Sequence, residues 1–253
     1  MAGCKATDGT QERSIYISPD CAVLNTFSDN TVPVVRSGDA LPTPAVSITE
    51  VGGLAGPVPS PSRLDELVSH FYSLMFDTEC NGERHLVLKW SQDIYIKSGP
   101  AHDVPSRLNA ITPVLEALTG IKFNLIISRK RANIEIFEEP AYPFDCFVLY
   151  QNKPDGSFDS AQIQMGKNYP ASERTECLLE ELSQILGPFN DVTTIKDTLW
   201  RPLELKTYHS LTWSDAVILR TLYDARIRPG MHRDVAMPIV RVIIGELLVE
   251  LNR

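Results

Sequence analysis

The 253-residue sequence lacks any apolar run near the roughly 20 residues that a membrane-spanning helix needs. Its most apolar stretch, residues 235–251, is interrupted by Pro238, Arg241, Gly245 and Glu246, so we expect a core helix there. Acidic residues outnumber basic ones, 32 to 24, and the net charge of −8 disfavours nucleic acid as a partner. A phosphate-binding glycine loop and a Gly-x-Ser-x-Gly elbow are missing, which removes common sequence signs of nucleotide binding and serine hydrolysis.

Histidine is scarce. Five histidines occur, and no two have the i, i+4 spacing that puts two zinc ligands on one helix face. They are His70, His85, His102, His209 and His232. We therefore expect ordinary surface or core histidines, and only His209, just before a predicted helix, is considered for a binding cleft.

The five cysteines are few enough to be considered one by one. Cys4 follows Ala2 and Gly3, and this tripeptide resembles the end of a bacterial lipoprotein signal, in which the cysteine is acylated. The apolar region that precedes such a cysteine is missing from the sequence, so a chance match in a cytosolic protein is the alternative. Four other cysteines remain, an even set that fits two disulfides in an oxidising compartment or four reduced, buried thiols.

Residues 1–61 are expected to form a lipoprotein-type leader and a flexible tether. Proline recurs there among Ser, Thr, Gly and Asp, and no apolar period is sustained. The alternative is an arm that docks on a partner, which the short apolar pieces at residues 15–17 and 32–35 allow.

Residues 62–253 are expected to form one globular α+β domain. Apolar periodicity predicts a helix capped by Ser62, a strand at 85–97, a helix at 106–119 in which Pro113 is awkward, and strands at 121–128, 132–137, 145–150 and 160–165. Further helices are predicted at 176–187, after a Thr212–Asp215 capping box, and at 234–251.

The helix at 176–187 organises the candidate site. Its apolar stripe consists of Leu178, Leu179, Leu182, Ile185 and Leu186. Glu180, Gln184 and Gly187 fall together on the opposite face. By spacing alone, this is a surface helix with solvated polar groups.

The same helix resembles the metal-binding helix of zincin metalloproteases, in the metzincin form His-Glu-x-x-His-x-x-Gly-x-x-His. Glu180, Gln184 and Asn190 take the three histidine positions, while Glu181 takes the catalytic glutamate and Gly187 the glycine. Only the last two match, so the resemblance implies a metallopeptidase scaffold without its zinc ligands. It also implies a zincin-like twisted sheet packed on a backing helix and on this helix, with an edge strand bordering a substrate cleft.

The chemistry that remains at these positions is narrow. Glu180, Gln184 and Asn190 or Asp191 offer oxygen ligands, which suit calcium, magnesium or manganese. We expect no metal and no cofactor, because one carboxylate and two neutral amides hold zinc poorly. If the protein is an enzyme, Glu181 is the expected catalytic residue.

A narrower resemblance covers residues 86–231. It is carried by the Glu-Glu-Leu-x-Gln-x-Leu-Gly helix, by Asn190-Asp191, and by the Leu-Tyr-Asp-x-Arg-x-Arg-Pro-Gly-Met turn at 222–231. These resemble a bacterial lipoprotein family of the domain-of-unknown-function type, number 2927. The resemblance implies a fold and a cellular location more than it implies a chemistry. The residues around Thr212, Asp215 and Tyr223 also look like the closing helix of matrixin-type metzincins.

These resemblances lead to expected pairings. Cys146 opens the strand beside the implied cleft and Cys177 lies in the first turn of the helix that borders it, so we expect them to form a disulfide. Cys21 and Cys80 are the remaining expected pair.

The acidic face of this helix needs neutralising partners if it is packed over. We expect Arg226 or Arg228 to pair with Glu181, with two solvent-exposed arginines as the alternative.

We therefore predict an exported, lipid-anchored protein of the bacterial envelope, periplasm-facing or at the outer membrane, that acts as a binding or assembly component on a degenerate metallopeptidase scaffold. The expected partner is a protein or peptide at the cleft and sheet edge, and the membrane is contacted through the lipid only. The alternatives are a hydrolase that uses Glu181 with an oxygen-ligated metal, and a cytosolic interaction protein.

Overall fold

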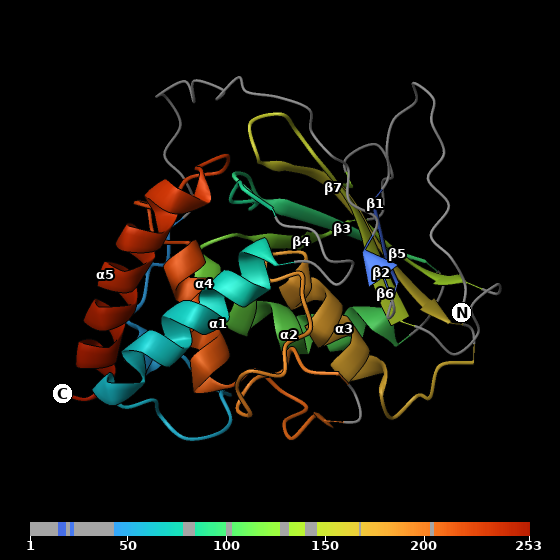
Figure 1. Ribbon diagram of the computed structural model, residues 1–253. Coiled ribbons are helices and arrows are strands. Elements are labelled where there is room, and N and C mark those ends of the chain that lie inside the picture. Colours follow the sequence, from blue (N-terminus) through green and yellow to red (C-terminus); the bar gives the residue numbers. More distant parts are fainter. Residues whose placement is uncertain are drawn as a thin grey trace.

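The computed structural model describes residues 15–18, 21–22, 43–77, 84–99, 103–126, 132–139, 146–166, 168–202 and 205–253. The fold is mixed α+β, with a twisted sheet covered by helices, as predicted (Figure 1). Within the described residues, no helix is both long and apolar enough to cross a membrane.

The central sheet has the strand order β6-β7-β5-β3-β4. The strands are β3 (Ile94–Ser98), β4 (Phe123–Leu125), β5 (Ile134–Glu139), β6 (Cys146–Asn152) and β7 (Phe158–Gly166). Neighbouring strands are parallel from β4 to β7, whereas β6 is antiparallel to β7. Beyond β6, β1 (Ile15–Ser18) adds an antiparallel strand, and β2 (Cys21–Ala22) pairs with β1.

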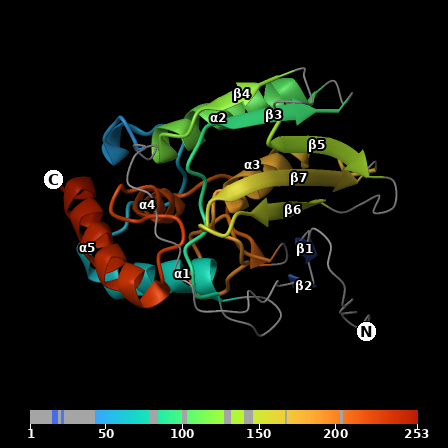
Figure 2. The same ribbon diagram turned by 90° about the horizontal axis from the view of Figure 1, so that it is seen from above.

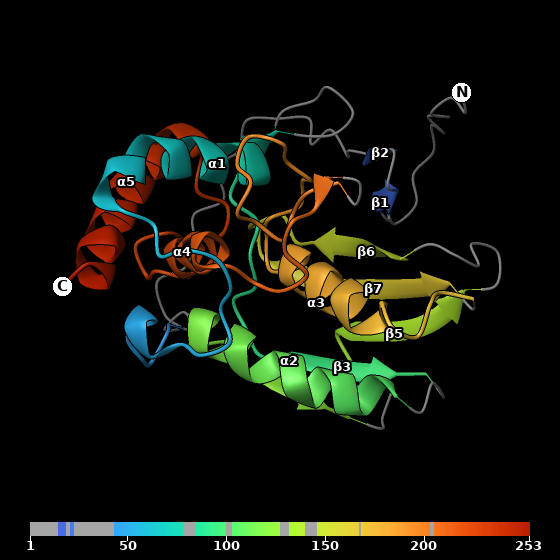
Figure 3. The same ribbon diagram turned by 90° about the horizontal axis from the view of Figure 1, so that it is seen from below.

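Two helices lie on one face of the sheet, and three form a group to one side of it (Figures 2 and 3). On the sheet face are α2 (Val104–Thr119) and α3 (Arg174–Gln184). The side group is α1 (Leu64–Phe76), α4 (Trp213–Leu222) and α5 (Arg233–Leu251). The short 3-10 helices η1 (Ile48–Glu50) and η2 (Pro61–Arg63) precede α1.

The core joins α3 to the sheet and to the side group. The apolar stripe of α3 is buried as predicted, and Leu178 and Leu182 are fully enclosed. Two buried indoles tie the end of this helix to its neighbours: Trp90 donates from Nε1 to the carbonyl oxygen of Ile185 at 2.9 Å, and Trp200 donates to Oγ of Ser183 at 2.8 Å. The position of α3 is therefore held by hydrogen bonds as well as by apolar packing.

The capping box predicted for α4 is present. The backbone amide of Asp215 donates to Oγ1 of Thr212, and the carboxylate of Asp215 accepts from the backbone amide of Thr212. Asp215 is completely buried and also accepts from Oγ1 of Thr198 at 2.6 Å and from the amide of Leu199. Burial raises the pKa of Asp215 to about 6, although these donors pull in the opposite direction.

Part of the predicted tether is packed against the helices. Ile48 is 1% exposed, the amide of Ala55 donates to the carbonyl oxygen of Leu211, and Arg220 donates to the carbonyl oxygen of Val46. The packed chain thus begins no later than residue 43, rather than at residue 62. These contacts use backbone groups and isolated apolar residues, which leave no periodic signal in a proline-rich segment.

Further elements differ from the sequence prediction. Helix α1 follows Arg63 without a side-chain cap, so the cap predicted at Ser62 is wrong. The strand expected at 85–97 is limited to β3, and the residues before it form only isolated bridges, Leu86 with His232 and Lys89 with Ser157. Helix α2 begins at Val104 and continues through Pro113. Pro113 and Asn109, whose carbonyl oxygen loses its intrahelical donor, are both exposed, so water can take over that hydrogen bond.

Candidate functional site

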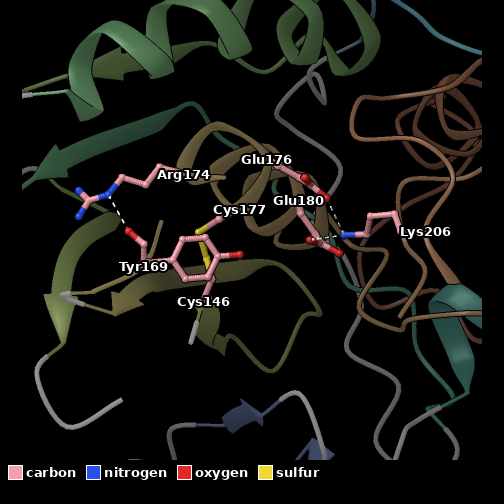
Figure 4. The surroundings of a disulfide bond; sticks show 7 residues. All are labelled: Cys146, Tyr169, Arg174, Glu176, Cys177, Glu180 and Lys206. Atoms are coloured by element: carbon pink, nitrogen blue, oxygen red, sulfur yellow. Dashed lines mark hydrogen bonds and ion pairs between the residues drawn. A yellow bond between two sulfur atoms is a disulfide. The ribbon is translucent and has the colours of Figure 1, made fainter. Parts of the chain in front are cut away.

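The acidic face of α3 is neutralised by a lysine from the loop before α4 (Figure 4). The Nζ atom of Lys206 lies 2.7 Å from Oε2 of Glu180 and 3.3 Å from Oε1 of Glu176. The side chain of Lys206 is only 3% exposed, against 16% for Glu176 and 17% for Glu180. An ammonium group therefore binds the carboxylate that takes the first metal-ligand position of the zincin pattern.

The electrostatics of this cluster are dominated by burial. Burial raises the pKa of Glu180 to about 7, although the nearby Lys206 pulls in the opposite direction. Burial lowers the pKa of Lys206, but Glu180 and Glu176 outweigh it, so the pKa of Lys206 stays above its ordinary value. Lys206 is thus held as a cation between two carboxylates, and Glu180 changes charge near neutral pH.

Tyr169 faces the same cluster. In Figure 4 its hydroxyl points toward Glu180, and its ring lies beside the disulfide. Burial, reinforced by Glu173, Glu180 and Glu176, raises the pKa of Tyr169 to about 12. The phenol therefore stays protonated and presents a hydrogen-bond donor to this acidic surface.

The structure brings His209 to the same helix face. Its Nδ1 lies 2.6 Å from Oε2 of Glu176, and its side chain is 65% exposed. The imidazole therefore contacts the rim of the Lys206 cluster and is open to solvent.

The remaining zincin-pattern positions are tied to the protein's own atoms. Gln184 donates from Nε2 to Oδ1 of Asp191 at 3.2 Å, and Asn190 donates from Nδ2 to the carbonyl oxygen of Ser73 at 2.8 Å. Gln184 is 6% exposed and Asn190 is 4% exposed. Both amides are thus enclosed and serve internal hydrogen bonds.

Gly187 fits its place for a steric reason. Its φ angle is +140°, and a Cβ atom there would lie 2.5 Å from Cδ2 of Leu222 and 3.0 Å from the carbonyl oxygen of Leu88. A larger residue would push α4 and the segment before β3 away from the end of α3. The glycine of the zincin pattern is therefore explained here by close packing.

Glu181 is 7% exposed, and Arg226, one of the two arginines predicted to pair with it, has other carboxylate partners. The guanidinium of Arg226 instead pairs with Asp224 at 2.8 Å and with Glu246 at 2.6 Å, on the exposed surface beside α5. Arg228 is also an exposed residue. The turn at 222–231 folds toward α5, so Arg226 forms its ion pairs there. Lys206, from the loop before α4, pairs with the carboxylates on the acidic face of α3.

The predicted disulfide between Cys146 and Cys177 is confirmed. It joins the first residue of β6 to the first turn of α3, with the two Cα atoms 6.1 Å apart (Figure 4). Of the other expected pair, Cys21 lies in β2 and Cys80 lies outside the described residues, as does Cys4. The end strand of the central sheet is thus covalently fixed to the candidate site.

Two buried cations near the end of α3 were missed from the sequence. Lys89 is completely buried and donates to the carbonyl oxygens of Leu222 and Ile227, each at 2.8 Å. Arg84 is 8% exposed, and its guanidinium carbon lies 4.4 Å from the ring centre of Phe189. Neither position carries a local pattern that distinguishes it from a surface cation, because each side chain is buried by segments distant in sequence.

The residues at the zincin-pattern positions do not form a site suited to a zinc ion. In the described part of the chain, no group of three or more His, Cys, Asp or Glu side chains lies close enough to hold an ion. Glu180 is bound by Lys206, and the two amides at the other pattern positions donate to protein oxygens, so their nitrogens face the acceptors. These residues do not fit the zinc of a metallopeptidase.

A cavity of about 490 Å³ lies elsewhere, where β3 and β4 end beside the start of α2. Its lining includes Ile96, Ser98, Gly99, Pro105 and Leu125, and none of its lining residues belongs to α3. The Lys206 cluster and this cavity are therefore separate features.

Comparison with known sequences agrees with one of the resemblances. No curated protein is significantly similar to the chain. The family described as Protein of unknown function (DUF2927) matches residues 130–242, which include β5, β6, β7, α3, α4 and the first half of α5. The segment that carries β6, the disulfide and the acidic face of α3 therefore matches the DUF2927 family.

Proposed function

We propose that this is an exported, lipid-anchored binding or assembly protein of the bacterial envelope, whose degenerate metallopeptidase scaffold captures an extended peptide by strand addition at β6. The observation that carries the proposal is the pairing of β6: it ends the five-strand sheet, accepts a further antiparallel strand, and is tied by a disulfide to α3. Strand addition uses main-chain hydrogen bonds of this kind for affinity.

The element order supports a zincin-like scaffold. Strand β3, helix α2, strands β4 to β7 and helix α3 follow one another, and α2 and α3 lie on one face of the sheet (Figure 3). This agrees with a sheet that packs on one backing helix and on the active-site helix, with an edge strand beside the substrate position. The argument is one of architecture, and the site must assign the chemistry.

The site chemistry favours binding over hydrolysis. A metallopeptidase needs a bound ion that polarises the peptide carbonyl and activates water. At Glu180 the neighbouring cation is the ammonium of Lys206, which neither coordinates nor activates a water molecule in that way. Glu181 then has no metal-bound water to deprotonate, whereas the backbone edge of β6 can still bind a peptide.

The envelope location rests on Ala2-Gly3-Cys4 and is supported by the Cys146–Cys177 disulfide, which fits an oxidising compartment. The test is metabolic labelling with a fatty-acid analogue, with the gene expressed together with its natural upstream region. We expect the parent protein to be labelled and Cys4→Ser to be unlabelled. Equal labelling of the two would contradict the anchor.

One sample tests binding against hydrolysis. The purified protein is assayed for metal by elemental analysis, and a library of extended peptides is screened for both cleavage and binding. We expect bound peptides that remain intact, and we expect them to slow amide hydrogen exchange in residues 146–152. Cleavage that depends on a stoichiometric metal and is abolished by Glu181→Gln would favour the hydrolase instead.

A further inference from the structure

The outer edge of β6 is occupied by the protein's own N-terminal segment. Ile15 pairs with Tyr150, and Tyr16 pairs with Leu149, in antiparallel register. The chain then turns back, so that Ile17 and Ser18 pair with β2 on the other side of β1. Figures 1 and 2 both place β1 directly beside β6.

We infer that β1 is an exchangeable intramolecular occupant of the peptide-binding edge, so that an external peptide binds to β6 by displacing it. This inference rests on the proposed strand capture at β6. It adds that the free edge exists only after β1 has left, and that the ligand is an extended segment antiparallel to β6.

The described contact between β1 and β6 is small. Within the described residues it consists of two residue pairs, and a typical backbone hydrogen bond contributes about 1 kcal/mol net. Such a strand would not stay bound as a free peptide at low concentration. Its persistence must come from its attachment to the same chain.

Attachment supplies a high local concentration. Residues 23–42 connect β2 to the packed chain. A random coil of that many residues has a root-mean-square span of about 25 Å. Linkers of this kind give effective concentrations on the order of 1 mM. If the β1 segment itself binds the free edge with a Kd on the order of 0.1 mM, this effective concentration lowers the apparent affinity of a competing peptide about tenfold.

The sequence of β1 indicates the chemistry of the exchanging ligand. Ile15-Tyr16-Ile17 is β-branched and aromatic, which is the composition that pleated, half-buried strands prefer. Charge and proline are absent from this tripeptide, so every one of its residues can offer a backbone donor. The matching partner is an apolar, proline-free peptide segment.

The test uses the full chain and a fluorescent peptide with the sequence of residues 14–18. The double variant Ile15→Pro/Tyr16→Pro removes both backbone donors of the β1 residues that face β6, whichever one is used. Ser28→Pro, in the connection after β2, is the matched control. Peptide affinity is measured by anisotropy, and amide exchange of residues 146–152 is followed by mass spectrometry.

We expect the double variant to bind the peptide about tenfold more tightly than the parent and to exchange its β6 amides faster until peptide is added. The control should behave like the parent.

Equal, measurable affinities for parent and double variant would overturn the exchange while leaving peptide capture intact. Absence of binding in both, with no exchange protection from the peptide or from the library ligands, would overturn peptide capture itself. A parent that is dimeric, with a monomeric double variant, would show that β1 comes from a second copy and would refute the intramolecular assignment.

Discussion

The ammonium group of Lys206 lies 2.7 Å from the carboxylate of Glu180, at the helix position where a zincin carries its first zinc ligand. A single positive charge, supplied by the chain itself, is thus the counter-charge of this carboxylate.

Lys206→Met is expected to cost about 3 kcal/mol of unfolding free energy at pH 7.5, because it leaves Glu180 and Glu176 without their buried partner. The loss should shrink to about 1 kcal/mol at pH 5, since the raised pKa of Glu180 lets the folded protein take up a proton there and discharge that carboxylate. Urea unfolding at both pH values measures the difference. Lys122→Met, which breaks the exposed pair with Glu116, is the control and should cost under about 1 kcal/mol. A loss that is equal at the two pH values would rule out the charge explanation.

Zinc binding should require two changes together. Glu180→His, Gln184→His and Asn190→His restore the imidazoles of the pattern, but Lys206 would then place a cation beside the metal. We expect the triple variant to bind zinc at least tenfold more weakly than the same variant with Lys206→Met, as measured by competition with a chromogenic chelator. The unaltered protein should show no rise in melting temperature with one equivalent of zinc. A stoichiometric zinc that survives mild chelation of the unaltered protein would refute this view of the site.

Removal of the Cys146–Cys177 disulfide should lower stability by about 3–4 kcal/mol, the value that chain entropy gives for a separation of 31 residues. Cys146→Ala/Cys177→Ala is compared with the parent by urea unfolding with and without reductant. The parent should lose this increment when reduced, and the variant should lack it from the start. The variant should also show faster amide exchange in β6, because the strand is no longer fixed to α3. Unchanged stability, or free thiols at both positions in peptide mapping, would disprove the role assigned to the bond.

Arg226→Ala is expected to change stability by less than about 1 kcal/mol, because Arg226 and Glu246 are 42% and 56% exposed. A double-mutant cycle with Glu181→Gln should show no coupling, since Arg226 binds Asp224 and Glu246 instead. Thermal and urea unfolding of the four proteins in the cycle provide the measurement. A coupling energy above about 1 kcal/mol would restore the ion pair predicted from the sequence.

Lys89→Met should change the pH dependence of stability. Burial lowers the pKa of Lys89 to about 7, so at pH 7 the folded state resists a proton that the unfolded state readily binds, and this penalty fades as the pH rises toward the ordinary lysine value. We expect the parent to gain about 2 kcal/mol relative to the variant between pH 7 and pH 9. The variant itself should be less stable than the parent at pH 9, because the carbonyls of Leu222 and Ile227 lose their donor. Parallel stability curves for the two proteins would contradict the buried titration.

The sequence predicted the parts of the fold that repeat locally. The stripe from Leu178 to Leu186 and the Thr212–Asp215 capping box depend on neighbouring residues, and each is present. The Cys146–Cys177 bond could be predicted because a family resemblance placed a strand and a helix side by side.

The contacts that the sequence did not predict are made by segments without regular secondary structure, whose path through the fold has no local sequence signal. Lys206 reaches Glu180 from a loop without periodicity, and Ile48 enters the core from a proline-rich segment. The pairing of Arg226 with Glu246 was not predicted, because sequence order does not reveal that its turn folds toward α5. Long-range partners of this kind are chosen by packing, so charge type alone could not identify them.

If Cys4 carries the proposed lipid, the pairing of β1 also limits how far the domain can lie from the membrane. While β1 stays on β6, only residues 5–14 lie between the lipid and the sheet, and their contour length is on the order of 35 Å. If a captured peptide replaces β1, residues 5–42 would separate the lipid from the packed chain, and the contour length of a segment of that size is on the order of 130 Å. Ligand binding at one strand edge would then increase the maximum distance between the domain and the membrane. The domain would stay close to the membrane surface without a ligand and could contact more distant structures with one.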